Sequence, residues 1–155
     1  MGWDAHLRPQ AEGLAVAAAG LFIDPVRPVE TAIITHGHAD HARAGHGTVY
    51  ATPETLAVMA ARYGEAFADH PRPLPYGETV DLGPYRFSLH PAGHVIGSAQ
   101  VLIETADGRA VVSGDYKRQD DPTCAPFETV PCDLFVTEAT FALPVFRHPD
   151  AAGEI

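Results

Sequence analysis

The stretch THGHADH, residues 35–41, places three histidines and an aspartate within seven residues, directly after an apolar run. In an extended segment that leaves a strand, His36 and His38 project to the same side, so their imidazoles can bind one metal ion. Asp40 and His41 come next, and a helix beginning in DHARAG would turn them toward a second ion. Without a cation, this cluster would cost desolvation and mutual repulsion. The stretch therefore predicts a metal site in the segment that directly follows a strand.

Two later stretches offer further ligands for the same site. His94 stands in PAGHVIGSAQ and Asp115 stands in VVSGDYK, each directly after a glycine and close to an apolar run. The glycine lets the backbone approach a crowded centre, and an aspartate there can bridge two ions. Nitrogen-rich ligation favours zinc, with manganese or iron as alternatives once carboxylates join the set.

Short apolar runs between turn residues predict a sheet-rich domain. Strands are expected at residues 14–17, 21–23, 32–34, 49–51, 85–89, 100–104, 110–112 and 134–136. The dipeptide Asp107-Gly108 predicts a tight primed turn that pairs two of these runs antiparallel.

One helix is expected after the histidine-rich stretch, capped by Thr52 and ended by Gly64. Its spacing predicts a stripe that packs against a sheet, formed by Leu56, Met59, Ala60 and Tyr63. Residues 69–78, DHPRPLPYGE, are expected to be a proline-rich loop.

The composition predicts one soluble domain, with 155 residues, 46% hydrophobic and 19% charged. No signal peptide or membrane span is expected, which favours a cytoplasmic protein. The net charge of -10 argues against a broad basic surface for nucleic acid, although two divalent cations would supply a local positive field. Arg43, Lys117 and Arg118 lie near the motifs and either contact phosphate or form ordinary solvated turns.

Residues outside the motifs are interpreted as structural. The isolated histidines are expected to be satisfied polar or surface groups, namely His6, His46, His70, His90 and His148. Cys124 and Cys132 lack a metal or disulfide spacing and are expected to be buried structural cysteines.

In their order along the chain, Asp24, the HxHxDH stretch, His94 and Asp115 resemble the motifs of the metallo-β-lactamase superfamily. GHVIGSAQ and TEAT, the latter with Glu138, are similar to the β-CASP nuclease branch of that superfamily. HLRP, FIDPVRPV, THGHADHARAGHG and VSGDYKRQDDPTCAPFE resemble bacterial DNA ligase-associated exonucleases more narrowly.

The resemblance implies an α/β fold, the αββα sandwich of that superfamily, with residues 1–155 forming its N-terminal half to two-thirds. The inserted β-CASP domain and the C-terminal part, which carry further active-site histidines in the family, are expected to be absent from this stretch. Half a sandwich is expected to expose the inner face of its sheet, which would make the product prone to aggregation.

The resemblance also implies a set of site residues. The first metal ion would be bound by His36, His38, His94 and Asp115, and the second by Asp40, His41 and a shared Asp115. Asp24 would orient the ligands through hydrogen bonds rather than bind metal. Asp40, Asp115 and Glu138 would carry the catalysis, with Glu138 organising protons.

The implied function is metal-dependent phosphodiester cleavage of the DNA exonuclease type, in which two ions activate water. DNA is the expected substrate, with RNA as an alternative, and a DNA ligase and a helicase are the expected partners. Two other interpretations stay open because a fold does not fix a substrate. One is a hydrolase of a small ester or thioester, and the other is an inactive metal-binding fragment.

Overall fold

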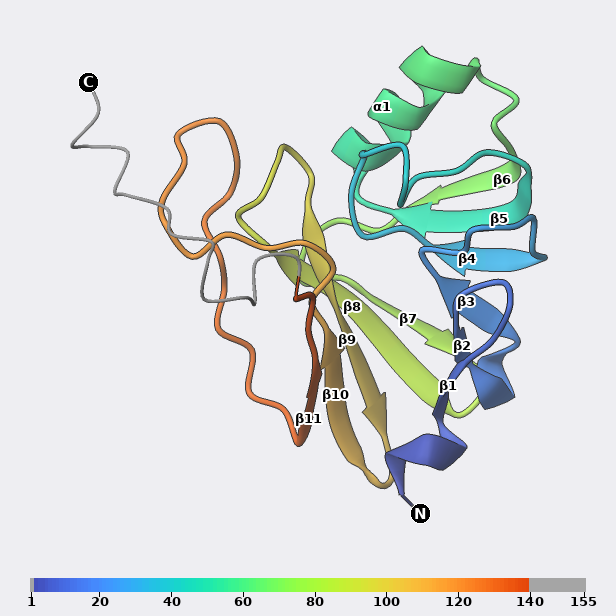
Figure 1. Ribbon diagram of the computed structural model, residues 1–155, viewed down its shortest axis with the longest axis vertical. Coiled ribbons are helices and arrows are strands. Elements are labelled where there is room, and N and C mark those ends of the chain that lie inside the picture. The colour runs from blue at the N-terminus through green and yellow to red at the C-terminus, as the bar shows by residue number, and fades with distance from the viewer. Residues whose placement is uncertain (1, 140–155) are drawn as a thin grey trace.

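The computed structural model describes residues 2–139 as two β-sheets and one α-helix, together with two short 3-10 turns (Figure 1). The first sheet, sheet A, has the order β1-β2-β3-β4-β5-β6, and the second, sheet B, has the order β11-β10-β9-β8-β7. The strands of sheet A are β1 Leu7–Pro9, β2 Leu14–Val16, β3 Leu21–Ile23, β4 Thr31–Ile33, β5 His46–Ala51 and β6 Ala68–Pro73. Those of sheet B are β7 Thr79–Leu82, β8 Tyr85–Pro91, β9 Ala99–Thr105, β10 Gly108–Val112 and β11 Leu134–Val136. The helical elements are η1 Trp3–Ala5, η2 Ala17–Ala19 and α1 Pro53–Tyr63.

The direction of the strands places several chain segments at the same end of the molecule. In sheet A, strands β3, β4, β5 and β6 run parallel to one another. In sheet B the neighbours are antiparallel except for β10 and β11, which are parallel. Because parallel strands end at the same edge of a sheet, the segments after β3 and β4 lie together, as do those after β10 and β11.

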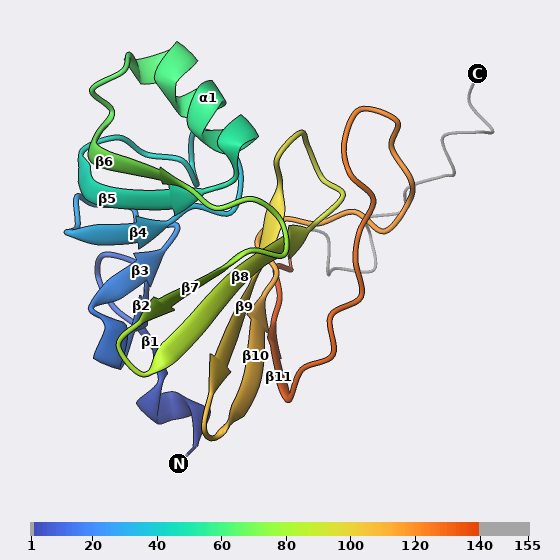
Figure 2. The ribbon, with the colours of Figure 1, turned by 180° about the vertical axis from the view of Figure 1, so that it is seen from behind.

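The core has two parts, one on each face of sheet A. Between the sheets, Ile33 of β4 packs with Phe87, Val101 and Ile103 of sheet B, all of them fully buried. On the other face, Ile34 packs with Met59 of α1. The layers are therefore α1, sheet A and sheet B, and α1 lies beside β5 and β6 in both views (Figure 1 and Figure 2).

These layers confirm the expected α/β sandwich, with one difference. The expectation of an exposed inner sheet face is wrong, since the inner faces of sheets A and B bury one another. Residues 2–139 contain one helical layer of the expected αββα arrangement, the one formed by α1. Within the same residues, no helix is long and apolar enough to cross a lipid bilayer.

The predicted helix is confirmed, and its stripe is partly wrong. Thr52 caps α1 by accepting a hydrogen bond from the backbone N–H of Thr55 at 3.3 Å. Leu56 and Met59 are buried as expected. Tyr63, however, is 39% exposed, and the Arg62 guanidinium lies 5.5 Å from its ring centre. Tyr63 therefore lies outside the core cluster that Leu56 and Met59 join on this face of sheet A.

The predicted antiparallel pairing of the two hairpin strands is confirmed, but the turn that connects them differs from the prediction. Strands β9 and β10 pair antiparallel, with Thr105 opposite Gly108. The two connecting residues are thus Ala106 and Asp107, and neither has the positive φ of a primed turn. The positive φ of 133° falls on Gly108, which already pairs as the first residue of β10.

The proline-rich segment at 69–78 was expected to be a loop, and its first half is instead β6. This strand pairs parallel with β5, placing Val49 opposite Pro71 and Ala51 opposite Pro73. An edge strand tolerates proline because the missing N–H can face away from the sheet. The sequence prediction also missed the short strands β1 and β7.

Candidate metal centre

The segments that follow β3, β4, β8, β10 and β11 bring the predicted site residues to one end of the sandwich. Asp24 directly follows β3, and the HxHxDH stretch follows β4. His94 lies between β8 and β9, and Asp115 lies three residues after β10. In Figure 1 the connections after β4, β8 and β10 gather where the two sheets meet.

Four of the predicted ligands converge into a first cluster, consisting of His36, His38, His94 and Asp115. His36 Nε2 lies 3.1 Å from His38 Nδ1, which lies 3.2 Å from His94 Nε2. Asp115 Oδ2 lies 3.7 Å from both His36 Nε2 and His94 Nε2. Three ring nitrogens and a carboxylate oxygen thus surround one point.

These separations fit a bound cation better than a hydrogen-bond network. A tetrahedral zinc ion with bond lengths of about 2.0–2.1 Å requires ligand atoms roughly 3.3 Å apart. A single imidazole nitrogen cannot share proper hydrogen bonds with two other ring nitrogens at once, yet His38 Nδ1 faces both His36 and His94. The donor set therefore suits a divalent metal ion.

His36 is fixed in the form that a metal ion needs. Its ring is fully buried, and its Nδ1 lies 3.0 Å from Thr35 Oγ1, which itself donates to Asp24 Oδ2 at 2.6 Å. The Thr35 oxygen is therefore left to accept from Nδ1–H, and the Nε2 lone pair points into the first cluster. Burial, followed by the neighbouring histidines, lowers the pKa of His36 to about 3.

Asp24 is an acceptor of hydrogen bonds at the base of the centre. Its Oδ1 accepts from the Thr35 backbone N–H at 2.7 Å, and its Oδ2 accepts from Thr35 Oγ1 and from His41 Nδ1 at 2.8 Å. Asp24, His36 and His41 could by distance alone hold an ion. Because both Asp24 oxygens are already used by donors, we assign it to hydrogen bonding instead.

The backbone of Asp24 is unusual as well. Its φ of 45° is the only positive value at a non-glycine residue among residues 2–139. Aspartate and asparagine tolerate this left-handed conformation better than most residues. The turn there aims the carboxylate at the start of the HxHxDH stretch.

A second, looser cluster adjoins the first. His41 Nε2 lies 3.6 Å from Asp40 Oδ2 and 3.6 Å from Asp115 Oδ1. The two oxygens of Asp115 therefore face different clusters, Oδ2 the first and Oδ1 the second. The hydrogen bond to Asp24 is the main cause that raises the pKa of His41.

The expected helix at DHARAG is wrong, and a single turn positions Asp40 and His41 instead. The backbone N–H groups of His41 and Ala42 both bond to the His38 carbonyl, at 3.0 and 2.7 Å, and the turn goes no further. The chain must reach β5 by His46, which leaves no room for a helix. The turn still places His41 Nε2 within 3.6 Å of both Asp40 Oδ2 and Asp115 Oδ1.

Comparison with known proteins agrees with this geometry. The sequence signature of the metallo-beta-lactamase superfamily matches residues 13–153. The chain belongs to the metallo-beta-lactamase superfamily. The residues of both ligand clusters lie within the matched range.

Several curated relatives of this superfamily member carry nucleic-acid names. A probable DNA ligase of Opitutus terrae is 32% identical over 98% of the chain. An endoribonuclease ysh1 of Emericella nidulans is 29% identical over 90% of it, and the transcription termination factor FttA of Methanosarcina mazei is 31% identical over 76%. The chain spans only 15%, 20% and 24% of the length of these three proteins.

Glu138 lies near the first cluster without belonging to it. It follows β11, whose Val136 carbonyl accepts from the N–H of Ser113, just before Asp115. Glu138 is outside both groups of converging ligand atoms found within residues 2–139. Burial is the main cause that lowers the pKa of His94. Attraction to nearby carboxylates, including that of Glu138, opposes this shift, so the charge of Glu138 acts on His94.

The basic residues near the motifs divide into two kinds. Lys117 Nζ pairs with Asp121 Oδ2 at 3.2 Å, which partly neutralises it. Arg43 and Arg118 are exposed to solvent.

The isolated histidines follow the prediction with one exception. His6 bonds to Tyr85 and Asp107, and His90 bonds to Ser88 and Glu128, while His70 is exposed. The prediction for His46 holds only in part: this buried ring accepts from the Val29 backbone N–H at Nδ1, at 3.3 Å, whereas its Nε2 has no hydrogen-bond partner within the described residues. His148 lies outside those residues. Cys124 and Cys132 are free and only half-buried, which corrects the expectation of buried cysteines.

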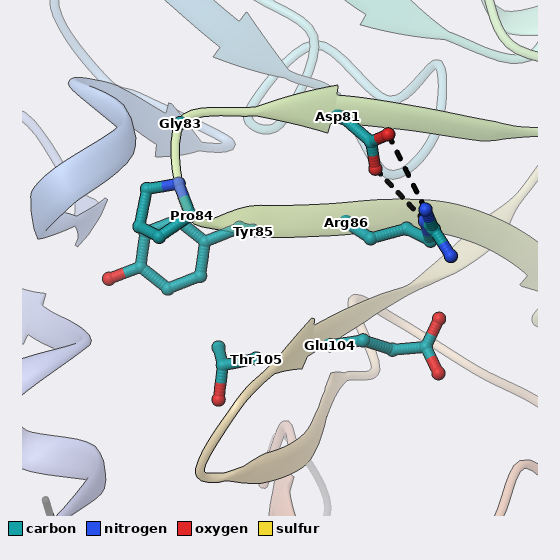
Figure 3. A pocket seen from close by; sticks show the side chains of 7 residues that line it. All are labelled: Asp81, Gly83, Pro84, Tyr85, Arg86, Glu104 and Thr105. Atoms are coloured by element: carbon teal, nitrogen blue, oxygen red, sulfur yellow. Dashed lines mark hydrogen bonds and ion pairs between the residues drawn. The ribbon is translucent and has the colours of Figure 1, made fainter.

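An open pocket of about 400 Å³ lies elsewhere, on strands β7 to β9 of sheet B (Figure 3). Asp81 and Arg86 form an ion pair across it, with Arg86 Nε 2.9 Å from Asp81 Oδ1. The residues that line it are Asp81, Gly83, Pro84, Tyr85, Arg86, Glu104 and Thr105. It contains no member of either ligand cluster.

Sequence reasoning missed the hydroxyl groups that support the ligands. Thr35 stands inside the quoted motif, yet its link between Asp24 and His36 was not anticipated. Ser98 accepts hydrogen bonds from the backbone N–H groups of His94 and Val95. The sequence signal for this support was the presence of a hydroxyl residue, Thr35 or Ser98, inside or beside each ligand motif.

Proposed function

We propose that this chain carries the cation-binding part of a nucleic-acid phosphodiesterase, of the DNA exonuclease type that works beside a DNA ligase. The observation that carries the proposal is the shared carboxylate of Asp115, whose two oxygens face two adjacent ligand clusters. Paired cation sites of this kind suit the displacement of an oxygen from a phosphodiester.

The residues take distinct roles in this proposal. His36, His38, His94 and Asp115 would hold a first divalent ion, and Asp40, His41 and Asp115 a second. The nitrogen-rich first cluster favours zinc, and the carboxylate-rich second cluster also suits manganese or iron. When bound, such ions lower the pKa of water and offset the charge of a phosphate group. Glu138, in the electrostatic environment of His94, would accept or return a proton.

Two observations favour nucleic acid over a small ester or thioester. The relatives include an endoribonuclease and a probable DNA ligase, which fit phosphodiester chemistry. The charge of the Glu138 carboxylate acts on His94, a member of the first cluster. The net charge of -10 does not oppose this choice, because two bound dications would offset it locally.

The proposal includes a larger assembly. Because the chain spans a minor part of its relatives, we propose that residues 1–155 are part of a domain completed by an inserted β-CASP domain and a C-terminal portion. Its cytoplasmic partners would be a DNA ligase and a helicase. Such a division explains how the second cluster could gain further ligands from the completing part.

The decisive experiment measures cleavage by the protein encoded in the complete open reading frame. Single-stranded DNA, duplex DNA, RNA, a thioester and a β-lactam are offered in parallel, with zinc or manganese. DNA cleavage is expected, and Asp115→Ala should reduce it by more than the roughly 100-fold that loss of a supporting residue costs. Asp69→Ala, which changes an exposed aspartate of β6, serves as the matched control.

Three outcomes would overturn the proposal. Turnover of the thioester or β-lactam without nucleic-acid cleavage would assign the metal centre to another hydrolase. Full DNA cleavage by Asp115→Ala would remove the shared carboxylate from the mechanism. Metal binding with no turnover of any substrate would instead favour an inactive metal-binding protein.

A further inference from the structure

The loop that carries His94, residues 93–98, is closed by a serine. Ser98 Oγ accepts from the backbone N–H of His94 at 3.0 Å and from that of Val95 at 3.2 Å. The Ser98 N–H also bonds to the Val95 carbonyl at 3.0 Å. The loop therefore has a defined shape, and that shape sets the direction in which His94 leaves it.

The first turn of α1 fixes this loop from one side. The carbonyl of Gly97 accepts from Thr52 Oγ1 at 2.7 Å and from Thr55 Oγ1 at 3.2 Å. Both threonines are fully buried, at 1% and 0% exposure. Gly97 has a φ of 75°, and a Cβ there would lie 2.8 Å from Thr52 Oγ1, so no other residue could make this approach.

A tyrosine fixes the loop from the other side. Tyr76 Oη donates to the Ser98 carbonyl at 2.7 Å. Burial is the main cause that raises the pKa of Tyr76 to about 12, so its hydroxyl stays a donor over the physiological range. The loop is thus held at Gly97 by two donors and at Ser98 by a third.

This support differs from that of the other ring ligands. His36 and His41 are oriented through hydrogen bonds of their own Nδ1 atoms, to Thr35 and Asp24. His94 is supported through its backbone and its loop. Losing a loop donor should therefore displace His94 while leaving the orientation of His36 and His41 unchanged.

We propose that Thr52, Thr55 and Tyr76 are positioning residues for His94 and so set the affinity of the first cluster for its cation. The proposal rests on the metal centre of the proposed function and not on its substrate. It links the start of α1 and Tyr76 to cation binding through hydroxyl groups that are 18 to 42 positions away from His94 in the sequence.

The test uses Thr55→Val, which removes one donor to Gly97 and leaves the Thr52 cap of α1 in place, and Thr55→Ser, which restores the hydroxyl. Zinc affinity is measured by competition with a chromophoric chelator, and the visible spectrum of the Co²⁺ form reports ligand geometry. Thr55→Val should weaken binding of the first ion by about 10- to 100-fold and alter the Co²⁺ spectrum. Thr55→Ser should stay close to the parent protein.

Two further variants test whether a loss of affinity comes from these hydroxyl groups rather than from misfolding or from any threonine-to-valine change. Tyr76→Phe removes only a hydroxyl, so it should fold normally and weaken the affinity in the same direction by a smaller factor. Thr105→Val is the matched control, because Thr105 Oγ1 also donates to a glycine carbonyl, that of Gly108, in the distant β9–β10 turn. The control should leave both the affinity and the spectrum unchanged.

A double-variant comparison separates positioning from general stability. If the hydroxyls act through His94, Thr55→Val should cause no further loss of the weakened first-site zinc affinity that a His94→Ala protein retains when it is titrated at high zinc concentration. An equal loss in that background overturns the proposal, as do unchanged affinities in both Thr55→Val and Tyr76→Phe. Absence of nuclease activity alone would reject the proposed substrate while leaving this binding comparison intact.

Discussion

The two ligand clusters are built in different ways, although they share Asp115. The first cluster takes its atoms from three separate connections, and His36 at its base is fully buried. The second relies on the neighbours Asp40 and His41 in one turn, and the side chain of Asp40 is 75% exposed. Long-range packing thus organises the first cluster, whereas one short turn and Asp24 organise the second. We expect the first to bind its cation more tightly.

The largest effects should come from removing one ring ligand at a time. His94→Ala should lose the first ion and keep the second, because His41 and its bond to Asp24 remain. His41→Ala should do the reverse. Each variant should fall from two bound ions to one, with an affinity loss above the roughly 100-fold typical of supporting residues.

Metal content per protein, measured by native mass spectrometry, checks this pair. His70→Ala is the control, since His70 is exposed on the edge strand β6 and belongs to neither cluster. Two retained ions in His94→Ala or in His41→Ala would break the distinction between the clusters.

Asp24→Asn should weaken the binding of the two ions by different factors, and by less than the loss of a ring ligand does. Asparagine accepts the positive φ at this position, so the change removes charge without straining the backbone. The second ion should bind about 10- to 100-fold more weakly because His41 loses its carboxylate partner. The first ion should be affected less, since Asp24 reaches His36 only through Thr35.

A two-site zinc titration measures both affinities in Asp24→Asn. Asp81→Asn, which alters an exposed ion pair on sheet B, is the corresponding control. A greater loss at the first site than at the second would reverse the assigned roles of Thr35 and Asp24.

The smallest effect is a difference in pH dependence. Burial lowers the pKa of His36 to about 3, so protons compete for its Nε2 only in strong acid. Asp24 raises the pKa of His41, so His41 takes up a proton at a higher pH and must release it to bind a cation. As the pH falls, the second cluster should therefore lose affinity first, by up to about tenfold per pH unit. Zinc titrations across the neutral to mildly acidic range check this order, which a first-site loss at higher pH would contradict.

Local sequence signals predicted the elements whose structure depends on a few adjacent residues. The Thr52 cap, the buried run of β4 and the pairing of β9 with β10 belong to this group. The strand β6 was missed because its prolines resemble a loop until an edge position beside β5 makes them acceptable. The burial of His46 and the exposure of Tyr63 depend on where sheet A ends, which short-range patterns do not encode.

The candidate site was also predictable from the sequence only where its structure depends on adjacent residues. The ligand types and their order could be read from the HxHxDH stretch and the glycines before His94 and Asp115. The supporting hydroxyls could not, because Thr52 meets Gly97 across 45 residues and only the packing of α1 against the loop brings them together. The single turn at Asp40 likewise follows from the distance to β5 rather than from local helix preference.

The position of Asp115 between the clusters has a thermodynamic consequence. One carboxylate group that orients one oxygen toward each site makes the two binding equilibria linked rather than independent. An ion that fixes the Asp115 side chain at the first site also fixes the oxygen that faces the second site. Less conformational entropy is then lost when the second ion binds. By reciprocity, the second ion must raise the affinity for the first by the same factor. Occupation of the first site should therefore change the affinity measured at the second, even though the first site fills at a lower metal concentration.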